Sequence, residues 1–297
     1  MTLPDLDSLE CFEAAARLLN FRAASQAVSL TPAALGKRIA QLESQLGRKL
    51  FHRTTRKVEL TEAGLALVPR ARELLAQGRE CVRAVRGETG PPPMELTLGT
   101  RHELGLSWIV PMLGKLKETL PQVTLHLYFS SGPDLERRVR TTDIDCAVIS
   151  RAAVAPLMGE RLHREDYVFV GSPKLLARQP LVKDEQAVFH TLVDVHRELN
   201  LFNYWRDAQG GGERLQFGRV LVMGTIAAIR MLVLAGEGVA VLPLYLVQQD
   251  LEKKKLQTIF PDVTPRSDWF RLLHREDDPR RAIYQALART MNEVPLA

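Results

Sequence analysis

Residues 31–44 combine a helix start with a small, basic outward side, a combination suited to binding nucleic acid. Thr31 is a good N-cap, and Pro32 fits the first helical position, where no N–H is needed. Apolar residues recur at spacings of four, three and four along one stripe: Leu35, Ile39, Leu42 and Leu46. The opposite side carries Ala33, Lys37, Ala40 and Ser44. A helix with such small outward residues can enter a groove about 12 Å wide.

The basic residues of the chain are concentrated next to this helix. Residues 37–57 hold seven lysines and arginines and one acid, Glu43, so this stretch is net +6 whereas the whole chain is +5. Such a cluster is the electrostatic footprint of phosphate binding. We therefore expect double-stranded DNA as a partner. Base edges would be read by Thr31, Pro32, Ala33 and Lys37, and phosphates would be contacted by Arg38, Arg53, Arg56 and Lys57.

The neighbouring segments predict the elements that would position this helix. Residues 22–28 form an Ala-rich helical pattern, and Ser29-Leu30 supplies a turn, which together give a helix-turn-helix. Residues 50–60 have apolar ends and a Thr54-Thr55 tip, as in a short hairpin wing. Any amphipathic helix pair shows part of this pattern, so the period alone would leave the interpretation open.

With these motifs in place, the chain resembles the LysR-type transcriptional regulators. The resemblance rests on FRAASQAVSLTPAALGKRIAQLE (residues 21–43), LGRKLFHR (46–53) and LTEAG (60–64), in the order and spacing of that family. Two departures are Gly36, where the family commonly has Ser, and Ser25, where a second Ala is common. The departure at Gly36 concerns which bases are read.

Length and composition agree with a two-domain bacterial regulator. A chain of 297 residues predicts about two domains. No apolar run of eighteen residues exists, and the first residues carry acids where a signal peptide needs positive charge, so we expect a cytoplasmic protein without a membrane segment. Three cysteines, Cys11, Cys81 and Cys146, lie far apart and predict reduced thiols.

Residues 61–86 predict one long helix capped by Thr61, about 37 Å in length. A near-heptad seam runs through Leu67, Ala71, Leu74, Gly78, Cys81 and Val85. Because a Gly/Pro-rich linker at 87–93 follows, no flanking domain stands ready in sequence to cover this seam. We therefore expect a homodimer here, as the resemblance also implies. Whether dimers pair into a homotetramer is left open.

After the linker, strands and helices alternate, which predicts a mainly parallel sheet with helices on its faces. Strand patterns lie at 96–100, 123–129, 146–150, 167–171, 191–195, 220–223, 239–242 and 270–273; helical patterns lie at about 104–120, 133–141, 225–236 and 279–293. This half resembles the family's effector domain, similar to periplasmic solute-binding proteins, in which two α/β lobes share two crossover strands.

The expected fold is thus α/β, with a winged helix-turn-helix at 1–60, a linker (dimerisation) helix and hinge at 61–93, and a two-lobed, periplasmic-binding-protein-like effector-binding domain at 94–297. The first lobe covers 94–162 and 267–293, and the second covers 163–266.

Ligands of open α/β sheets bind beyond the carboxyl ends of strands and at helix N-termini, where free N–H groups favour anions. This rule selects Thr100, Arg101, His102, Ser130, Ser131, Ser150, Arg151, Asn203 and Thr225 as effector-binding candidates. The hydroxyls and arginines favour a carboxylate-bearing small molecule. Taken singly, each arginine is equally well read as solvated surface.

No catalytic constellation is found, so we expect no enzyme, no metal and no cofactor. Gly105-Leu106-Ser107-Trp108-Ile109 lacks the closing Gly of a nucleophile elbow, and His190 and His196 share no metal-ligand spacing. A third interpretation, a hydrolase or transferase acting through Ser107, has no other support. The alternative, a solute-binding protein without a DNA-binding role, would need an export signal and an N-terminal segment without the excess of positive charge.

The sequence therefore predicts a transcription regulator with two heads on a two-fold symmetric DNA site. Effector binding between the lobes would change their angle and so the spacing of the heads. RNA polymerase is a further expected partner. The effector, the target genes and the direction of control are not specified by the sequence.

Overall fold

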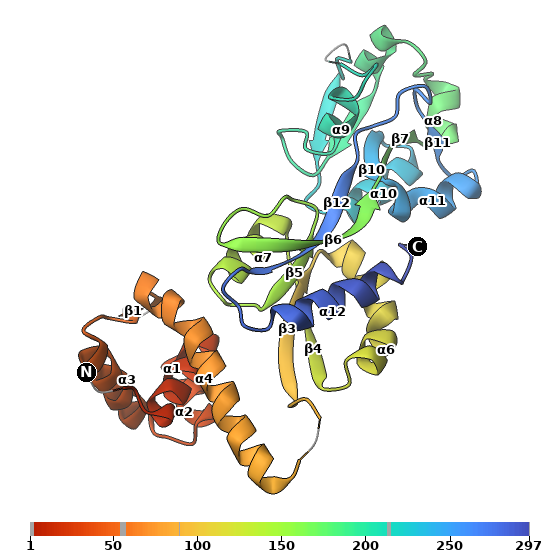
Figure 1. The fold of residues 1–297 in the computed structure, drawn as a ribbon. Helices are drawn as coiled ribbons and strands as arrows, with labels where there is room; N and C mark the ends of the chain where they lie inside the picture. The colour runs from red at the N-terminus through yellow and green to blue at the C-terminus, as the bar shows by residue number, and fades with distance from the viewer. Residues whose placement is uncertain (1–2, 54–57, 89, 213–214, 297) are drawn as a thin grey trace. The chain divides into compact units, whose positions relative to one another are not determined.

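The computed structural model describes residues 3–53, 58–88, 90–212 and 215–296 (Figure 1). The chain divides into two compact units. Unit 1 comprises Met1–Arg101, Met112–Glu160 and Arg271–Glu293, and unit 2 comprises His102–Pro111, Arg161–Phe270 and Val294–Ala297. None of the helices in the described part combines the length and apolar character that crossing a membrane requires. The domain boundaries drawn from the sequence stay a prediction beside these units.

The N-terminal part of unit 1, residues 3–88, is called the head below. Its elements are α1 (Leu6–Leu18), α2 (Phe21–Ala27), α3 (Pro32–Leu46), β1 (Phe51–Arg53), β2 (Val58–Leu60) and α4 (Glu62–Arg86). Each helix has a side-chain N-cap: Asp5, Asn20, Thr31 and Thr61 accept hydrogen bonds from backbone N–H groups of the first turn. The strands β1 and β2 pair antiparallel, with Phe51 opposite Leu60. The predicted winged helix-turn-helix is confirmed.

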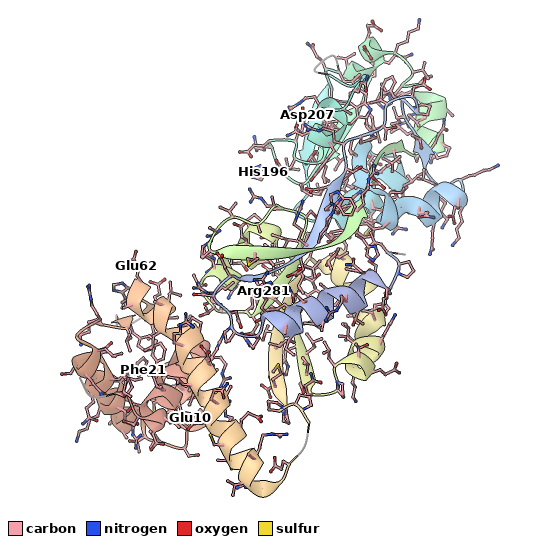
Figure 2. All side chains as sticks on the ribbon, in the orientation of Figure 1. Glu10, Phe21, Glu62, His196, Asp207 and Arg281 are labelled. Atoms are coloured by element: carbon pink, nitrogen blue, oxygen red, sulfur yellow. The ribbon has the colours of Figure 1, made fainter. Side chains whose placement is uncertain are left out.

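Three aromatic rings and the apolar stripe of α3 form the core of the head. Phe51 packs at 5.6 Å from Phe12 and at 5.5 Å from Phe21, ring centre to ring centre, and the Phe21 label in Figure 2 marks the start of α2. Leu35 and Ile39 are fully buried. Leu46 was expected on this stripe but is 38% exposed. It lies in the last turn of α3, where the chain leaves the core at Gly47 in a left-handed conformation (φ 67°).

The helix α4 is 25 residues long, and its first half packs against the rest of the head. Val68, Ala71 and Leu75 are buried there, so the expectation that no part of its own domain covers this helix was wrong for that half. A side chain at Gly78 would meet Leu6 of α1. The chain bends back after α3, so α1 lies beside α4 although 44 or more residues separate them (Figure 1). Leu74, between the buried Ala71 and Leu75 in sequence, is exposed, and so are Val82 and Val85 near the end of the helix.

The remainder of unit 1 is built on a five-stranded sheet of order β4-β3-β5-β12-β6. The strands are β3 (Met94–Thr100), β4 (Val123–Phe129), β5 (Cys146–Ile149), β6 (Leu157–Glu165) and β12 (Asp268–Arg275). β3 pairs parallel with β4 and β5, whereas β12 pairs antiparallel with β5. The helices of this part are α6 (Val110–Thr119), α7 (Gly132–Arg140) and α12 (Arg281–Asn292). β6 and β12 run from one unit into the other.

Unit 2 holds the second sheet, of order β11-β7-β10-β8-β9. Its strands are β7 (Tyr167–Gly171), β8 (Thr191–Asp194), β9 (Arg219–Val222), β10 (Val239–Pro243) and β11 (Gln257–Thr258). β10 pairs antiparallel with β7 and parallel with β8, so the sheet is mixed. Helical segments are α5 (His102–Leu104), a π-helix (Gly105–Ile109), α8 (Pro173–Arg178), a 3₁₀ helix (Asp184–Phe189), α9 (Phe202–Arg206), α10 (Ile226–Ala235) and α11 (Leu244–Glu252).

The structure corrects the expected element list in three places. β6 and β11 had no strand expectation, and α8, α9 and α11 had no helix expectation. The helix expected at 104–120 is present, but it contains a π-helical turn between α5 and α6. The strand pairs β10–β7 and β12–β5 are antiparallel, so both sheets are mixed and not mainly parallel throughout. The α/β fold with two sheets is confirmed.

Candidate nucleic-acid interface and ligand site

The expected base-reading residues lie on the open side of α3. The Thr31 hydroxyl accepts a hydrogen bond from the Ala34 N–H at 3.2 Å, which fixes the start of the helix. Thr31, Pro32, Ala33 and Lys37 are all exposed, while Leu35 and Ile39 face the core. The first turns of α3 therefore present a surface without bulky apolar groups, on which Lys37 carries the positive charge. Their DNA contacts stay a prediction.

Arg38 was expected to contact a phosphate, and the structure gives it acidic neighbours. Its Nη1 lies 3.1 Å from Oδ2 of Asp7 and 4.0 Å from Oδ1 of Asp5. The hydrogen bond with Asp7 raises the pKa of Arg38. A guanidinium has five N–H donors, so the pair with Asp7 orients the group and leaves donors for a second anion. The two carboxylates also weaken the positive field at this point.

The wing is anchored by Glu43, whose role the sequence analysis did not recognise. Glu43 is only 4% exposed, and its Oε1 accepts hydrogen bonds from the N–H groups of Leu50 (3.0 Å) and Phe51 (3.4 Å). Its Oε2 pairs with Lys49 Nζ at 2.9 Å. The signal was present, because Glu43 follows Ile39 by four residues and so lies on the buried side of the helix. One of the counted cations, Lys49, is thus paired within the head.

The other expected phosphate contacts are only partly described. Arg53 ends β1, and its backbone pairs with Val58, but its side chain lies outside the description. Arg56 and Lys57 lie outside the described residues. The strands that flank this tip are placed, so the wing is confirmed as an element while its phosphate contacts stay a prediction.

Within unit 1, three strand ends bring candidate effector residues together. β3 is flanked by β4 and β5, so the carboxyl ends of these three strands are neighbours. The Ser130 N–H donates to the Thr100 carbonyl at 3.1 Å. Thr100 itself is fully buried, and its hydroxyl donates to the Arg101 carbonyl at 3.3 Å. Thr100, Ser130 and Ser131 therefore share one edge, as the rule for open sheets predicts.

The first turn of α7 has one engaged hydroxyl and one exposed hydroxyl. Ser130 donates to Asp134 Oδ2 at 2.8 Å. Hydrogen bonds from Arg137 and Arg138 lower the pKa of Asp134 to about 2, so this carboxylate is charged at neutral pH. Ser131 is the N-cap residue and is exposed, and among the described contacts its hydroxyl makes no capping hydrogen bond. The N-terminus of α7 thus offers N–H groups and a hydroxyl to an anion, with Asp134 close by.

Ser150 and Arg151 follow β5 but differ in exposure. Ser150 is 8% exposed, and its carbonyl accepts from Arg271 Nη1 at 3.1 Å. Arg151 is exposed, with Nη1 at 3.9 Å from Oε2 of Glu136. This weak surface pair leaves the guanidinium able to exchange Glu136 for another carboxylate. Arg101 is partly exposed.

Three candidate residues lie in unit 2. His102 is exposed at the start of α5. Thr225 caps α10 by accepting from the Ala228 N–H at 3.2 Å, and Glu103 Oε1 accepts from the Ala227 N–H at 3.0 Å. The N-terminus of α10 therefore already has a carboxylate partner for one of its N–H groups. Asn203 Nδ2 donates to the Glu198 carbonyl at 3.2 Å.

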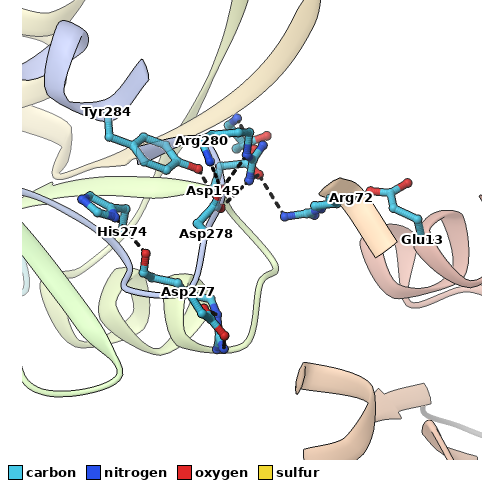
Figure 3. Close-up of polar contacts among 10 residues, drawn as sticks. Glu13, Arg72, Asp145, His274, Asp277, Asp278, Arg280 and Tyr284 are labelled. Atoms are coloured by element: carbon cyan, nitrogen blue, oxygen red, sulfur yellow. Dashed lines mark hydrogen bonds and ion pairs between the residues drawn. The ribbon is translucent and has the colours of Figure 1, made fainter. Parts of the chain in front are cut away.

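A mostly buried polar cluster lies where β5 and α12 begin (Figure 3). Arg280 donates to Asp278 Oδ2 at 2.7 Å and to Asp145 Oδ1 at 2.8 Å, and Tyr284 donates to Asp278 at 2.9 Å. Burial would raise the pKa of Asp278, but the hydrogen bonds and charge of Arg280 outweigh it and hold that pKa below its ordinary value. Asp145 also lies 3.5 Å from Arg72, so this carboxylate joins two arginines.

No metal-binding group stands out in the described residues. Among them, no three His, Cys, Asp or Glu side chains are grouped so that they could hold a metal ion. Cys11 and Cys146 are buried free thiols, and Cys81 is an exposed free thiol. Burial raises the pKa of the Cys11 and Cys146 thiols, so both are protonated at neutral pH. The described residues therefore give no support to a disulfide switch.

Two family models match the chain and together span most of it. A model described as "Bacterial regulatory helix-turn-helix protein, lysR family" matches residues 6–65, and one described as "LysR substrate binding domain" matches residues 89–295. Among curated proteins, the chain is 30% identical over 277 residues to a glycine cleavage system transcriptional activator homolog of Haemophilus influenzae, covering 93% of this chain and 89% of that protein. It is 28% identical over 273 residues to the glycine cleavage system transcriptional activator of Escherichia coli, covering 91% and 87%.

Solved structures show the same fold. ArgP from Mycobacterium tuberculosis matches with a TM-score of 0.75 and 19% identity, covering 99% of each chain. Full-length LysG from Corynebacterium glutamicum, described with bound effector Arg, matches with a TM-score of 0.69 and 20% identity, covering 98% of this chain and 99% of that one.

Proposed function

The chain belongs to the LysR family of transcriptional regulators, and we propose that it reads a specific DNA site through α3 and responds to a carboxylate-bearing metabolite. Its relatives place it among DNA-binding regulators with an effector domain, so neither the solute-binding alternative nor an enzyme is favoured. The observation that supports base reading is the exposed, small first part of α3, with Lys37 as its projecting cation.

The DNA contacts divide into two kinds in this proposal. Lys37 lies opposite the buried stripe, so it points at the groove floor when α3 enters a major groove. Arg38 and the wing residues Arg53, Arg56 and Lys57 hold phosphates, which contribute affinity for every sequence. Loss of a contact to the groove floor therefore lowers the discrimination between DNA sequences. Loss of a phosphate contact lowers the affinity for every DNA sequence and makes that affinity less dependent on salt.

Salt titrations test this division. A duplex selected by the wild-type protein from a random library is compared with an unselected duplex. Lys37→Ala should reduce the preference for the selected duplex, whereas Arg53→Ala should weaken both duplexes and reduce the salt slope by about one. Lys174→Ala, an exposed lysine of unit 2, is the matched control and should change neither quantity. Equal behaviour of Lys37→Ala and Arg53→Ala would contradict the assignment.

We further propose that an amino acid is the effector. Support comes from the N-terminus of α7 with its exposed Ser131, from the exposed Arg151, and from the relatives. One relative is described with bound Arg, and others are activators of a glycine cleavage system. A helix N-terminus and an arginine both favour a carboxylate.

Calorimetric titration with glycine and L-arginine tests this part. Methylamine and agmatine, which lack the carboxylate, are the matched control ligands. Binding of one amino acid but not of its decarboxylated form is expected, and Ser131→Ala should weaken it. The amino-acid assignment is wrong when neither carboxylate binds at millimolar concentration. The effector's action on DNA would then be read from the operator complex with and without the amino acid.

Exposed apolar residues on α4 support a dimer. Leu74 and Val85, two positions of the predicted seam, are 51% and 90% exposed, and Val82 is 50% exposed. A second copy of α4 would cover them. Val85→Glu should shift the protein toward the monomer in sedimentation analysis. Ala76→Glu, on another side of α4, should leave the mass unchanged, and a dimer that survives Val85→Glu would argue against this face. Tetramers and contact with RNA polymerase stay part of the proposal.

A further inference from the structure

Gly36 is an interior residue of α3 that the fold of the head does not require. Glycine is a poor helix former. Two structural features would require it inside a helix: a left-handed φ, or a neighbouring atom too close for a Cβ. Gly36 has neither, because its φ is not positive and a Cβ built on it meets nothing within 4 Å. Gly47, at the end of the same helix, shows the contrast with its φ of 67°. Folding alone would therefore favour alanine at position 36.

Gly36 lies on the flank of α3, between its buried and outward sides. Successive residues of a helix are turned by about 100°. Gly36 follows the buried Leu35 by one residue and precedes the exposed Lys37 by one residue. The neighbours on this flank, one turn away, are Pro32 and Ala40, both exposed. Within one turn of Gly36 this flank carries no hydrogen-bonding side chain, and the nearest one, Glu43 two turns later, is buried against the wing. Gly36 itself is partly exposed and has no side chain over its main chain.

The flank of a helix in the major groove faces the groove wall. The groove is about 12 Å wide and a helix with side chains is about 10–12 Å across, so the two sugar–phosphate strands touch its flanks while the floor meets its outward side. We propose that Gly36 is the point where the main chain of α3 comes closest to one sugar–phosphate strand, and that this close approach sets the depth at which Lys37 reaches the bases.

This inference rests on the proposed base reading by α3 and adds a positioning residue to it. A methyl group at position 36 stands between helix and groove wall and moves Lys37 away from the groove floor. The free protein has open space for that methyl group, so only the complex with DNA opposes it. Stability and DNA affinity should therefore change in opposite directions when Gly36 is replaced.

The test compares Gly36→Ala with Gly114→Ala in the full-length protein. Gly114 lies inside α6, and a Cβ there also meets nothing within 4 Å, so it is a matched helical glycine outside the DNA-binding head. Both variants should unfold at a higher temperature than the wild type. Only Gly36→Ala should bind the wild-type-selected duplex about tenfold more weakly, the loss typical of one disrupted base-pair contact, with a smaller loss on an unselected duplex.

Two outcomes would overturn the inference. Gly36→Ala that keeps wild-type affinity within about twofold would show that no close approach occurs there. If uracil in place of the thymines of the selected duplex abolishes the difference between Gly36→Ala and the wild type, the close neighbour is a thymine methyl and not the sugar–phosphate strand. A wild-type protein that selects no sequence at all would instead refute the proposed base reading.

Discussion

Replacing Glu43 by glutamine tests whether a buried carboxylate on the DNA-reading helix holds the wing in place. Glu43 accepts hydrogen bonds from the N–H groups of Leu50 and Phe51 and is 4% exposed. Glutamine keeps the size of the side chain and one acceptor oxygen but removes the charge. The substitution therefore isolates the contribution of the charge from that of packing.

The expected loss is about 2 kcal/mol of unfolding free energy of the head. A hydrogen bond to a charged group contributes about 1.5–3 kcal/mol, and one between neutral groups contributes about half as much. Two such bonds lose their charge assistance in Glu43→Gln. The Lys49 pair adds little to this sum, because the Lys49 side chain is 76% exposed.

Amide hydrogen exchange of the full-length protein measures this loss where it arises. The Leu50 N–H bonds directly to Glu43, so its exchange should become about tenfold to thirtyfold faster, as a loss of about 2 kcal/mol in local stability requires. Glu10→Gln is the control, because Glu10 is an exposed acid of α1 and carries the same charge (Figure 2). Unchanged exchange at Leu50 in Glu43→Gln, or an equal change in Glu10→Gln, would refute the anchoring role.

Three further changes have expected outcomes. Phe12→Ala should lower the unfolding free energy by about 4 kcal/mol in denaturant titration, because the fully buried ring contacts Phe51 and a cavity remains; a loss below about 1 kcal/mol would show that the core closes over the gap. Asp134→Asn should cost about 1 kcal/mol at pH 7, allowing for solvent screening. The pKa of Asp134 is lowered to about 2, so its contribution is complete above its ordinary pKa and is lost as the pH falls toward 2; a cost that does not shrink between pH 4 and pH 2 would contradict this. Glu103→Gln should speed exchange of the Ala227 amide about tenfold, and an unchanged rate would mean that water caps α10 equally well.

Local signals near the N-terminus could be read from the sequence because they act over a few residues. Thr31 and Pro32 mark the start of α3 through the geometry of one helical turn, and the structure begins the helix there. Thr61 marks α4 in the same way. The wing follows from alternating apolar ends around a polar tip. These features need no knowledge of the rest of the fold.

Features that depend on distant residues were missed. β6 has the polar sequence LMGERLHRE, and its buried positions do not alternate regularly, so no strand pattern stands out. Its neighbour in the sheet, β12, lies more than 100 residues later. The role of Glu43 depends on where Leu50 and Phe51 turn back onto α3. The half of α4 that packs on the head depends on α1, which lies before the predicted seam in sequence.

The candidate ligand residues show the same limit. The rule that ligands bind at strand ends selected Ser130, Ser131 and Thr225 alike. The structure distinguishes them by the hydrogen bonds that each hydroxyl already makes. Ser130 donates to Asp134, and Thr225 accepts a capping hydrogen bond from Ala228, whereas the exposed Ser131 makes no capping hydrogen bond. No sequence pattern predicts the second hydrogen bond at the start of α10, since Glu103 and its donor Ala227 are 124 residues apart.

The three sides of α3 carry separable tasks, so substitutions on the three sides should differ in how they change stability and DNA binding. The buried side fixes the head and, through Glu43, the wing, so a change there lowers stability before it alters DNA selection. Lys37 on the outward side makes no contribution to the core, so its loss should alter selection at unchanged stability. Gly36 on the flank should lose affinity while gaining stability, because the free helix prefers a side chain at that position and the groove wall excludes one.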